Sequence, residues 1–243
     1  MARSRSAALT AAIALAITGG ATTQASAATR AQKRCAHAGT TLTADSKARV
    51  YRRVVKTGDY SEPRTYGCWR RTGLRTRLDL VCDPDDGSPE GDDACRDDPA
   101  KIALRGRWVA LEFDAFYDGE GGDTYTTIVR ANLKRGRIRL HWARMAARLP
   151  NHGGGELWPY LIKLFISRHG GIAYSAEGVV EEPGEDPISM IGYVHPPKRG
   201  ANSAYNEWLD SGEDVDAASL RVDRRHRRVT WRTGGVAKHA RWR

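Results

Sequence analysis

Basic residues gather near the C-terminus in a pattern that could hold an anion. The segment Arg221–Arg228 reads RVDRRHRR, and the chain ends in Arg241–Arg243, with Trp231 and Trp242 near in sequence. Positive charge beside aromatic rings can hold a polyanion, and such binding weakens steeply with salt. The alternative is a solvated basic turn and a frayed end. The candidate polyanion-binding residues are Arg224, Arg225, Arg227 and Arg228.

Clustered carboxylates are the second set of residues with possible chemistry. The segment Asp83–Asp98 contains eight acids and one base, Arg96. Because Ca²⁺ takes about six to eight oxygen ligands, the Asp83–Asp93 loop is a possible calcium site. Its DPDDG start is one residue short of the usual calcium-loop spacing. A solvated acidic loop is therefore the alternative.

Catalytic motifs are weak in this sequence. Arg168-His169-Gly170 is similar to the RHG of histidine phosphatases, but it comes late in the chain, and a hairpin turn with glycines of positive φ explains it better. Glycoside cleavage requires two close carboxylates, which a sheet could assemble from distant positions. A secreted carbohydrate-active hydrolase is thus an alternative function. Its candidate acids are Glu112, Asp114, Glu207 and Asp210.

The N-terminal segment predicts export. Arg3 and Arg5 precede the apolar run Ala7–Ile17, and Ala25-Ser26-Ala27 has the small-x-small form of a cleavage site. These features are typical of a secretory signal peptide over residues 1–27. We therefore expect a short tail over residues 28–39 and one all-β domain over residues 40–243, located outside the cytoplasm.

The four cysteines are expected to form disulfides. An even number of cysteines behind a signal peptide is typical of an oxidising compartment. Three pairings are possible among Cys35, Cys68, Cys82 and Cys95. The favoured pairs are Cys82–Cys95, which would close the acidic loop, and Cys35–Cys68, which would tie the tail to a strand.

Alternating apolar residues predict the fold class. In Lys101–Trp142, Val109 and Leu111 alternate with polar positions, and tight turns such as Arg105-Gly106-Arg107 separate the runs. Period-two alternation places successive side chains on opposite faces of a strand. The segment therefore predicts a four-stranded antiparallel meander.

The remaining chain divides into similar units. Comparable units span residues 40–81, 158–210 and 217–242, and the last is one strand short. A four-bladed propeller-like domain would result if Thr40–Ala44 filled that gap. A β-sandwich or a barrel is the alternative. The segment Thr57–Pro63 is expected to be a loop.

Several sequence segments within these units resemble segments of a known class of proteins. YGCWRRTG at 66–73, LRGRWVALE at 104–112 and WLDSGEDVDAASLRV at 208–222 are among them. With these motifs the chain resembles secreted, β-propeller-like repeat proteins of unassigned function from GC-rich bacteria. That resemblance implies a fold and a location outside the membrane, but no reaction and no functional residues.

The sequence favours a non-enzymatic binding module of the cell envelope or extracellular space. The net charge is +10, and the excess of arginine over lysine is common in GC-rich genomes. We therefore expect no nucleic-acid partner. A cell-wall polymer or another envelope protein is the expected partner of a monomeric chain without a cofactor.

Overall fold

The structure is a computed structural model of the whole chain. It describes residues 30, 33–36, 39–79, 99–116, 124–141, 157–180, 187–195 and 206–242. In these ranges the backbone forms fifteen strands, and residues 33–36 form one helical turn. The strands make four antiparallel meander sheets, which confirms the predicted all-β class.

The first two sheets have four strands each. The strands of the first sheet are β1 (Thr40–Ala44), β2 (Ala48–Thr57), β3 (Tyr60–Trp69) and β4 (Leu74–Arg77). Those of the second sheet are β5 (Lys101–Arg105), β6 (Trp108–Phe116), β7 (Thr124–Asn132) and β8 (Arg137–His141).

The third sheet has four strands and the fourth has three. The strands of the third sheet are β9 (Leu157–Ile166), β10 (Ile172–Val180), β11 (Ile188–Val194) and β12 (Asn206–Gly212). Those of the fourth sheet are β13 (Val215–Asp223), β14 (Arg228–Thr233) and β15 (Val236–Arg241).

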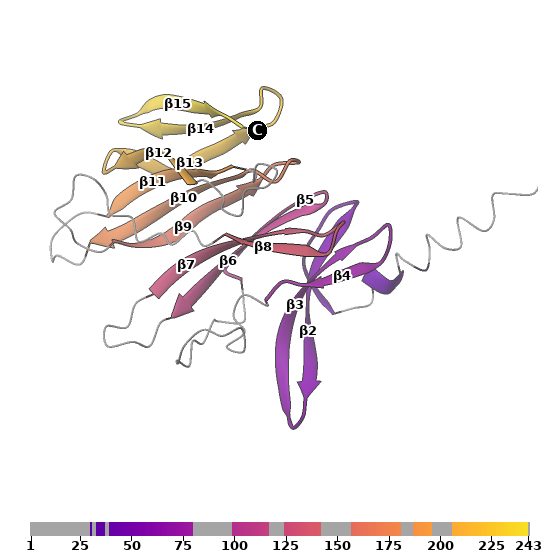
Figure 1. Cartoon of the computed structure of the whole chain (residues 1–243). Helices are drawn as coiled ribbons and strands as arrows, with labels where there is room; N and C mark the ends of the chain where they lie inside the picture. Colours follow the sequence, from indigo (N-terminus) through magenta and orange to yellow (C-terminus); the bar gives the residue numbers. More distant parts are fainter. Residues whose placement is uncertain are drawn as a thin grey trace, which may run out of the picture.

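The four sheets stack face to face in chain order (Figure 1). The second sheet lies between the first and the third, and both of its faces are buried against these neighbours. Val109 and Leu111 of β6 pack with Val50 of the first sheet, whereas Ala110 of β6 packs with Tyr174 of the third sheet. A third cluster, which includes Tyr193 and Trp231, joins the third and fourth sheets. The hydrophobic core therefore consists of three layers between four sheets.

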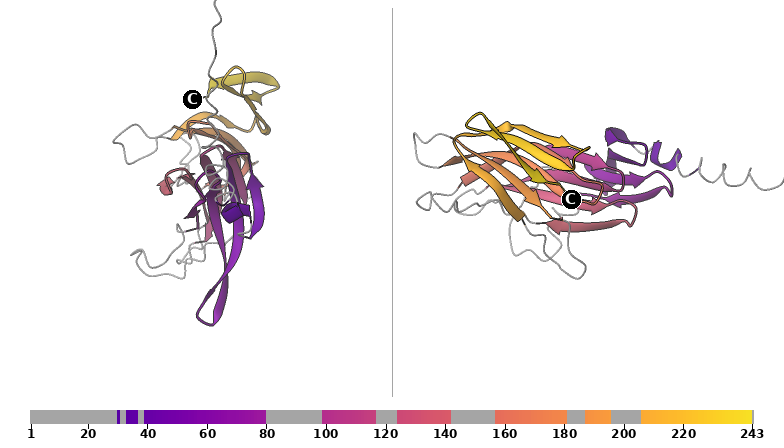
Figure 2. Two further views of the ribbon diagram at one scale, coloured as in Figure 1. Left: turned by 90° about the vertical axis from the view of Figure 1, so that its right-hand side faces the viewer. Right: turned by 90° about the horizontal axis from the view of Figure 1, so that it is seen from above.

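The stack stays open, so the expected closed four-bladed propeller is wrong. β1 pairs with β2 in the first sheet and does not complete the fourth (Figure 2). Closure would also require the two outermost faces to meet. On the outer face of the first sheet, Cys35 packs against Tyr51 and Cys68. β15 in the fourth sheet is almost entirely exposed.

The expected loop at Thr57–Pro63 is also wrong. β2 and β3 pair without interruption from Ala48↔Trp69 to Thr57↔Tyr60, and Gly58, with a φ of 62°, and Asp59 make a two-residue turn. The outer half of this hairpin projects from the stack as a two-stranded ribbon (Figure 1). Near its tip, Tyr60 is 78% exposed.

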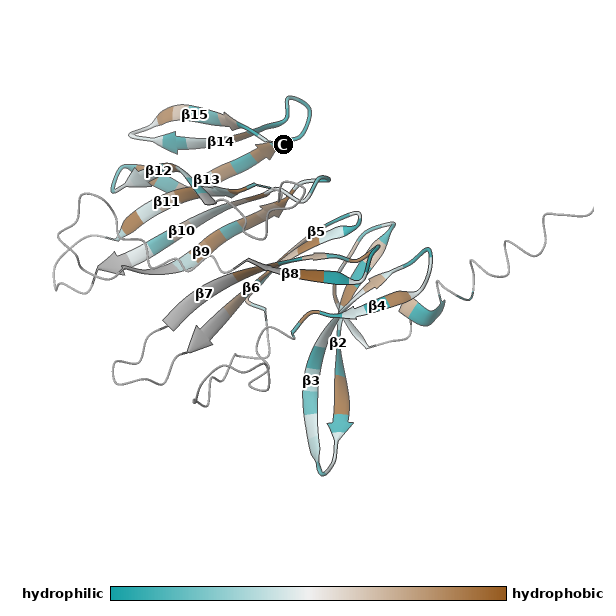
Figure 3. Ribbon diagram, in the orientation of Figure 1, coloured by the Kyte–Doolittle hydropathy of each residue, from teal (hydrophilic) through white to brown (hydrophobic). Residues whose placement is uncertain are grey.

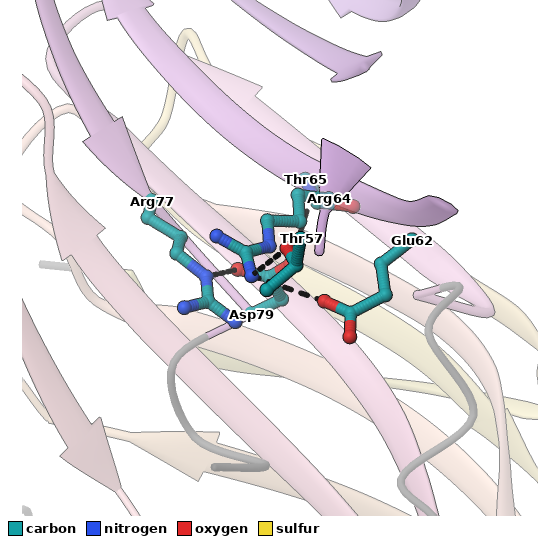
Figure 4. A network of polar contacts seen from close by, with 6 residues as sticks. All are labelled: Thr57, Glu62, Arg64, Thr65, Arg77 and Asp79. Carbon is teal, nitrogen blue, oxygen red and sulfur yellow. Dashed lines mark hydrogen bonds and ion pairs between the residues drawn. The ribbon is translucent and has the colours of Figure 1, made fainter. Parts of the chain in front are cut away.

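Polar contacts fix the root of the ribbon, where β4 ends (Figure 4). Asp79 accepts a hydrogen bond from the Thr65 backbone N–H at 3.1 Å and pairs with the Arg77 guanidinium at 2.7 Å. On the ribbon itself, Arg64 pairs with Glu62 at 3.0 Å and donates to the Thr57 hydroxyl at 3.1 Å. The network is structural, because each charged group in it already has a partner.

Candidate functional site

The first hairpin turns of all four sheets lie at one end of the stack. Gly106 of the β5–β6 turn donates its backbone N–H to the Asp45 carboxylate of the β1–β2 turn at 2.6 Å. Arg130 of β7 donates to the Gly170 carbonyl of the β9–β10 turn at 2.7 Å. The β13–β14 turn then borders a depression that the β9–β10 turn also lines. The turns thus form one continuous surface across the stack, which we call the basic end.

Hydrophilic residues occupy these turns (Figure 3). Most of the charged residues among them are lysines and arginines. The cations of the basic end come from the turns and strand ends of the four sheets. They are Lys47, Arg70, Arg71, Arg105, Arg107, Lys134, Arg135, Arg168, Arg224, Arg225, Arg227 and Arg241. In the part of the chain that the structure describes, none of them forms an ion pair with a carboxylate.

Two acids in these turns are occupied by their own turns. Asp45 accepts hydrogen bonds from the backbone N–H groups of Lys47 at 2.7 Å and Ala48 at 2.8 Å. Asp223 accepts from the His226 backbone at 3.0 Å and contacts the His226 ring at 2.6 Å. Hydrogen bonds from the backbone and ring of His226 hold the pKa of Asp223 below its usual value. Neither carboxylate forms an ion pair with an arginine in the part of the chain that the structure describes.

The basic end is hollowed into two adjoining depressions. One, of about 720 Å³, lies between the turns of the first three sheets and is lined by Trp69 and Arg70 among others. The other, of about 460 Å³, lies between the turns of the second, third and fourth sheets, beside Trp242. Arg105 and Arg168 line both, so the depressions meet at these two side chains. Together they give a groove that an extended chain molecule could follow.

The electrostatics of Arg105 show how closely the cations converge. Burial of its guanidinium, with the nearby positive charges of Arg224 and Arg168, lowers the pKa of Arg105. Like charges disfavour one another's charged form. An anion bound among these three side chains would relieve that repulsion.

The opposite end of the stack has acidic residues in two of its described turns. These turns are Gly58-Asp59 and Glu213-Asp214.

Three of the four predicted polyanion-binding arginines lie at the groove. Arg224, Arg225 and Arg227 line its smaller depression, whereas Arg228 begins β14 and is exposed. The sequence did not predict Arg105, Arg168 and the cations of the first sheet. The available signal was the repeated basic residue beside a turn glycine, as in Arg105-Gly106-Arg107.

The predicted Cys35–Cys68 disulfide is present, with 33 residues of separation. Cys82, Cys95 and the calcium candidate Asp83–Asp93 lie outside the described residues, so that pairing and that site stay predictions. Within the described ranges, no three or more His, Cys, Asp or Glu side chains gather as metal ligands would.

The acids considered for glycoside cleavage have separate structural partners. Glu112 is 2% exposed, pairs with Lys101 at 3.3 Å and accepts the Leu161 backbone N–H at 3.2 Å. Glu207 pairs with His195 at 2.6 Å. Asp210 accepts hydrogen bonds from three groups of the fourth sheet. The side chain of Asp114 lies outside the described set.

The Arg168-His169-Gly170 segment is a hairpin turn, as expected. Gly170 has a φ of 89°, and a Cβ atom at this position would lie 2.9 Å from the Trp108 indole. The Arg168 guanidinium donates to the His169 ring at 3.0 Å. Glycine is therefore required here for both conformation and space.

Comparison of the chain with protein-family models, with curated proteins and with solved structures finds no match. The structure supports one part of the resemblance to secreted propeller-like proteins, namely the arrangement in four antiparallel sheets. No helix in the described ranges is long and apolar enough to cross a membrane.

Proposed function

We propose that the chain is an exported, non-enzymatic binding module that holds anionic polymers of the cell envelope in the groove of its basic end. The observation that carries the proposal is the set of twelve cations at one end of the stack, without carboxylate partners among the described residues. Export rests on the predicted signal peptide over residues 1–27.

The groove favours an extended ligand over a compact one. Its two depressions cross the turns of all four sheets and share Arg105 and Arg168. Most of the cations are arginines, whose planar forks match phosphate and carboxylate oxygens in pairs. The walls are sheet ends joined by inter-sheet hydrogen bonds, so the ordering cost of binding falls on the cation side chains and not on the backbone.

The proposal is tested by binding of poly(glycerol phosphate) to the full chain over a series of salt concentrations. The logarithm of the binding constant is expected to fall linearly with the logarithm of the salt concentration, because the bound cations release counterions from the polymer. Retention on a heparin column at low salt, reversed by salt, is the simpler version. If the protein passes through that column without retention at low salt, the proposal is wrong.

A matched pair of triple variants separates the groove from general charge. Arg70→Gln, Arg71→Gln and Arg105→Gln remove three groove cations. For this variant, the slope of the logarithm of the binding constant against the logarithm of salt concentration should shrink by about one for each lost phosphate contact. The control replaces the exposed cations Arg53, Lys56 and Arg232, which lie outside the basic end, with glutamine. If both triples weaken binding equally, the groove is not the site.

A further inference from the structure

The smaller depression of the basic end has a composition suited to one highly charged group. Six arginines line its volume of about 460 Å³, against a single carboxylate, Asp223. That carboxylate already pairs with the His226 ring at 2.6 Å. The arginines come from β5, the β9–β10 turn, the β13–β14 turn and β15, so three sheets contribute to one cavity. They are Arg105, Arg168, Arg224, Arg225, Arg227 and Arg241.

Backbone strain is present in the same cavity. Arg227 has a φ of 53°, and it is the one residue other than glycine with positive φ in the described chain. At comparable places in the turns at this end, the chain uses Gly106 with a φ of 60° and Gly170 with a φ of 89°. The left-handed conformation costs a residue with a Cβ about 1–2 kcal/mol. A guanidinium is therefore held here at the expense of stability, which is typical of a functional position.

Cavity size and charge together indicate the ligand class. A phosphate monoester carries close to two negative charges and three terminal oxygens, whereas a diester carries one charge and two such oxygens. Each arginine guanidinium has about five N–H donors, so several arginines can donate hydrogen bonds to the three oxygens of one phosphate. Cavities of about 300–1,000 Å³ typically hold a small molecule, so there is room for the group that carries the phosphate.

We propose that this cavity binds a terminal phosphate monoester, through Arg105, Arg168, Arg224 and Arg227. The inference rests on the proposed function, because it names the group at the polymer's end that binds in this cavity. The rest of the polymer would lie in the larger depression. The same chemistry occurs in a soluble sugar phosphate and in a phosphatidic acid headgroup.

The test is calorimetric titration of the full chain with glucose 6-phosphate, glycerol 1-phosphate and the diester glycerophosphocholine. Monoesters are expected to bind at least ten-fold more tightly than the diester. Vesicles with phosphatidic acid, compared with vesicles with phosphatidylglycerol, show whether the source is a lipid. Binding to phosphatidic acid alone assigns the site to lipid; binding to the sugar phosphate assigns it to soluble ligands. Equal affinity for monoester and diester, or no monoester binding from either source, overturns the inference.

Arg227→Gly separates a functional role from a structural one. Glycine relieves the strain, so the thermal midpoint should rise while monoester affinity falls at least five-fold. Arg105→Gln should lower that affinity at least ten-fold, and Arg232→Gln, on β14 outside the basic end, should leave it unchanged. Unchanged affinity in Arg227→Gly and Arg105→Gln contradicts the inference. Binding of poly(glycerol phosphate) without any monoester binding would contradict the inference and leave the proposed function standing.

Discussion

The carboxylate of Asp210 in β12 accepts the indole N–H of Trp231 in β14 at 2.7 Å. The same oxygen, Oδ2, accepts the Thr233 hydroxyl at 2.6 Å and the Lys238 ammonium at 2.9 Å. One side chain of the third sheet therefore holds two strands of the fourth. Lys163 of β9 adds contacts to the Ala218 and Leu220 carbonyls of β13, so Asp210 and Lys163 both contribute to docking the three-stranded sheet.

Asp210→Asn is expected to destabilise the chain by about 1–3 kcal/mol, because a charged acceptor of three donors is lost. Partial burial raises the pKa of Asp210, but the hydrogen bonds from Thr233, Trp231 and Lys238 outweigh it and lower the pKa overall. This contribution is thus present above the unfolded pKa of 3.8 and is lost as pH falls through the folded pKa.

Urea unfolding at pH 7 and at pH 3 measures this effect. The difference in stability between wild type and Asp210→Asn should be smaller at the lower pH. Asp214→Asn, in the exposed β12–β13 turn, is the control and should change little. An equal difference at both pH values would contradict the role of the ionised carboxylate.

Glu112→Gln tests the junction between the second and third sheets. The carboxylate is 2% exposed and pairs with Lys101 at 3.3 Å, while its other oxygen accepts the Leu161 N–H at 3.2 Å. Glutamine can keep the backbone hydrogen bond but removes the charge opposite Lys101. We expect a loss of about 1–3 kcal/mol in urea unfolding. In the double variant Glu112→Gln with Lys101→Met, neither position carries a charge, so no ammonium group is left without its partner. This double variant should recover part of the lost stability.

Gly170→Ala tests the close approach at the basic end. Both this variant and Gly58→Ala place a Cβ at positive φ. A Cβ at position 58 would have no contact within 4 Å, whereas a Cβ at position 170 would lie 2.9 Å from the Trp108 indole. Each should lose about 1–2 kcal/mol from conformation. Gly170→Ala should lose at least about 1 kcal/mol more, because the indole must shift. Equal melting temperatures would show that the Trp108 contact is unimportant.

Removal of the Cys35–Cys68 disulfide by a double alanine substitution should cost about 3–4 kcal/mol. The estimate follows from chain entropy for a separation of 33 residues. The bond also fixes Cys35, which packs against Tyr51 on the outer face of the first sheet. Guanidinium unfolding of wild type and variant, both without reductant, measures the loss. A difference below about 1 kcal/mol would indicate that the tail adds no constraint.

Local sequence patterns predicted the strands well, but not all of their partners. Thr40–Ala44 is a strand with the expected bounds, yet it pairs with β2 and not with the last sheet. The reason is local: the Asp45 carboxylate accepts the N–H groups of Lys47 and Ala48 and so closes a tight turn. In Thr57–Pro63, one glycine and one proline resembled a loop, although a two-residue turn needs only Gly58 at positive φ.

The candidate site was only partly predictable for a different reason. Arg224, Arg225 and Arg227 are neighbours in sequence and therefore stood out as a cluster. Arg105 and Arg168 each come from a separate turn, and only the stacking order of the sheets brings them beside Arg224. No pattern of neighbouring residues contains that information.

The division between sheets and turns makes the fold a natural host for loop engineering. The side chains that hold the sheets together, such as Val109 and Ile172, lie within strands, whereas the groove cations lie mostly in turns of a few residues. Recognition and framework can therefore change independently. A library that randomises Arg168-His169 and Arg224–Arg227 while keeping Gly170 should yield folded proteins with new ligand preferences.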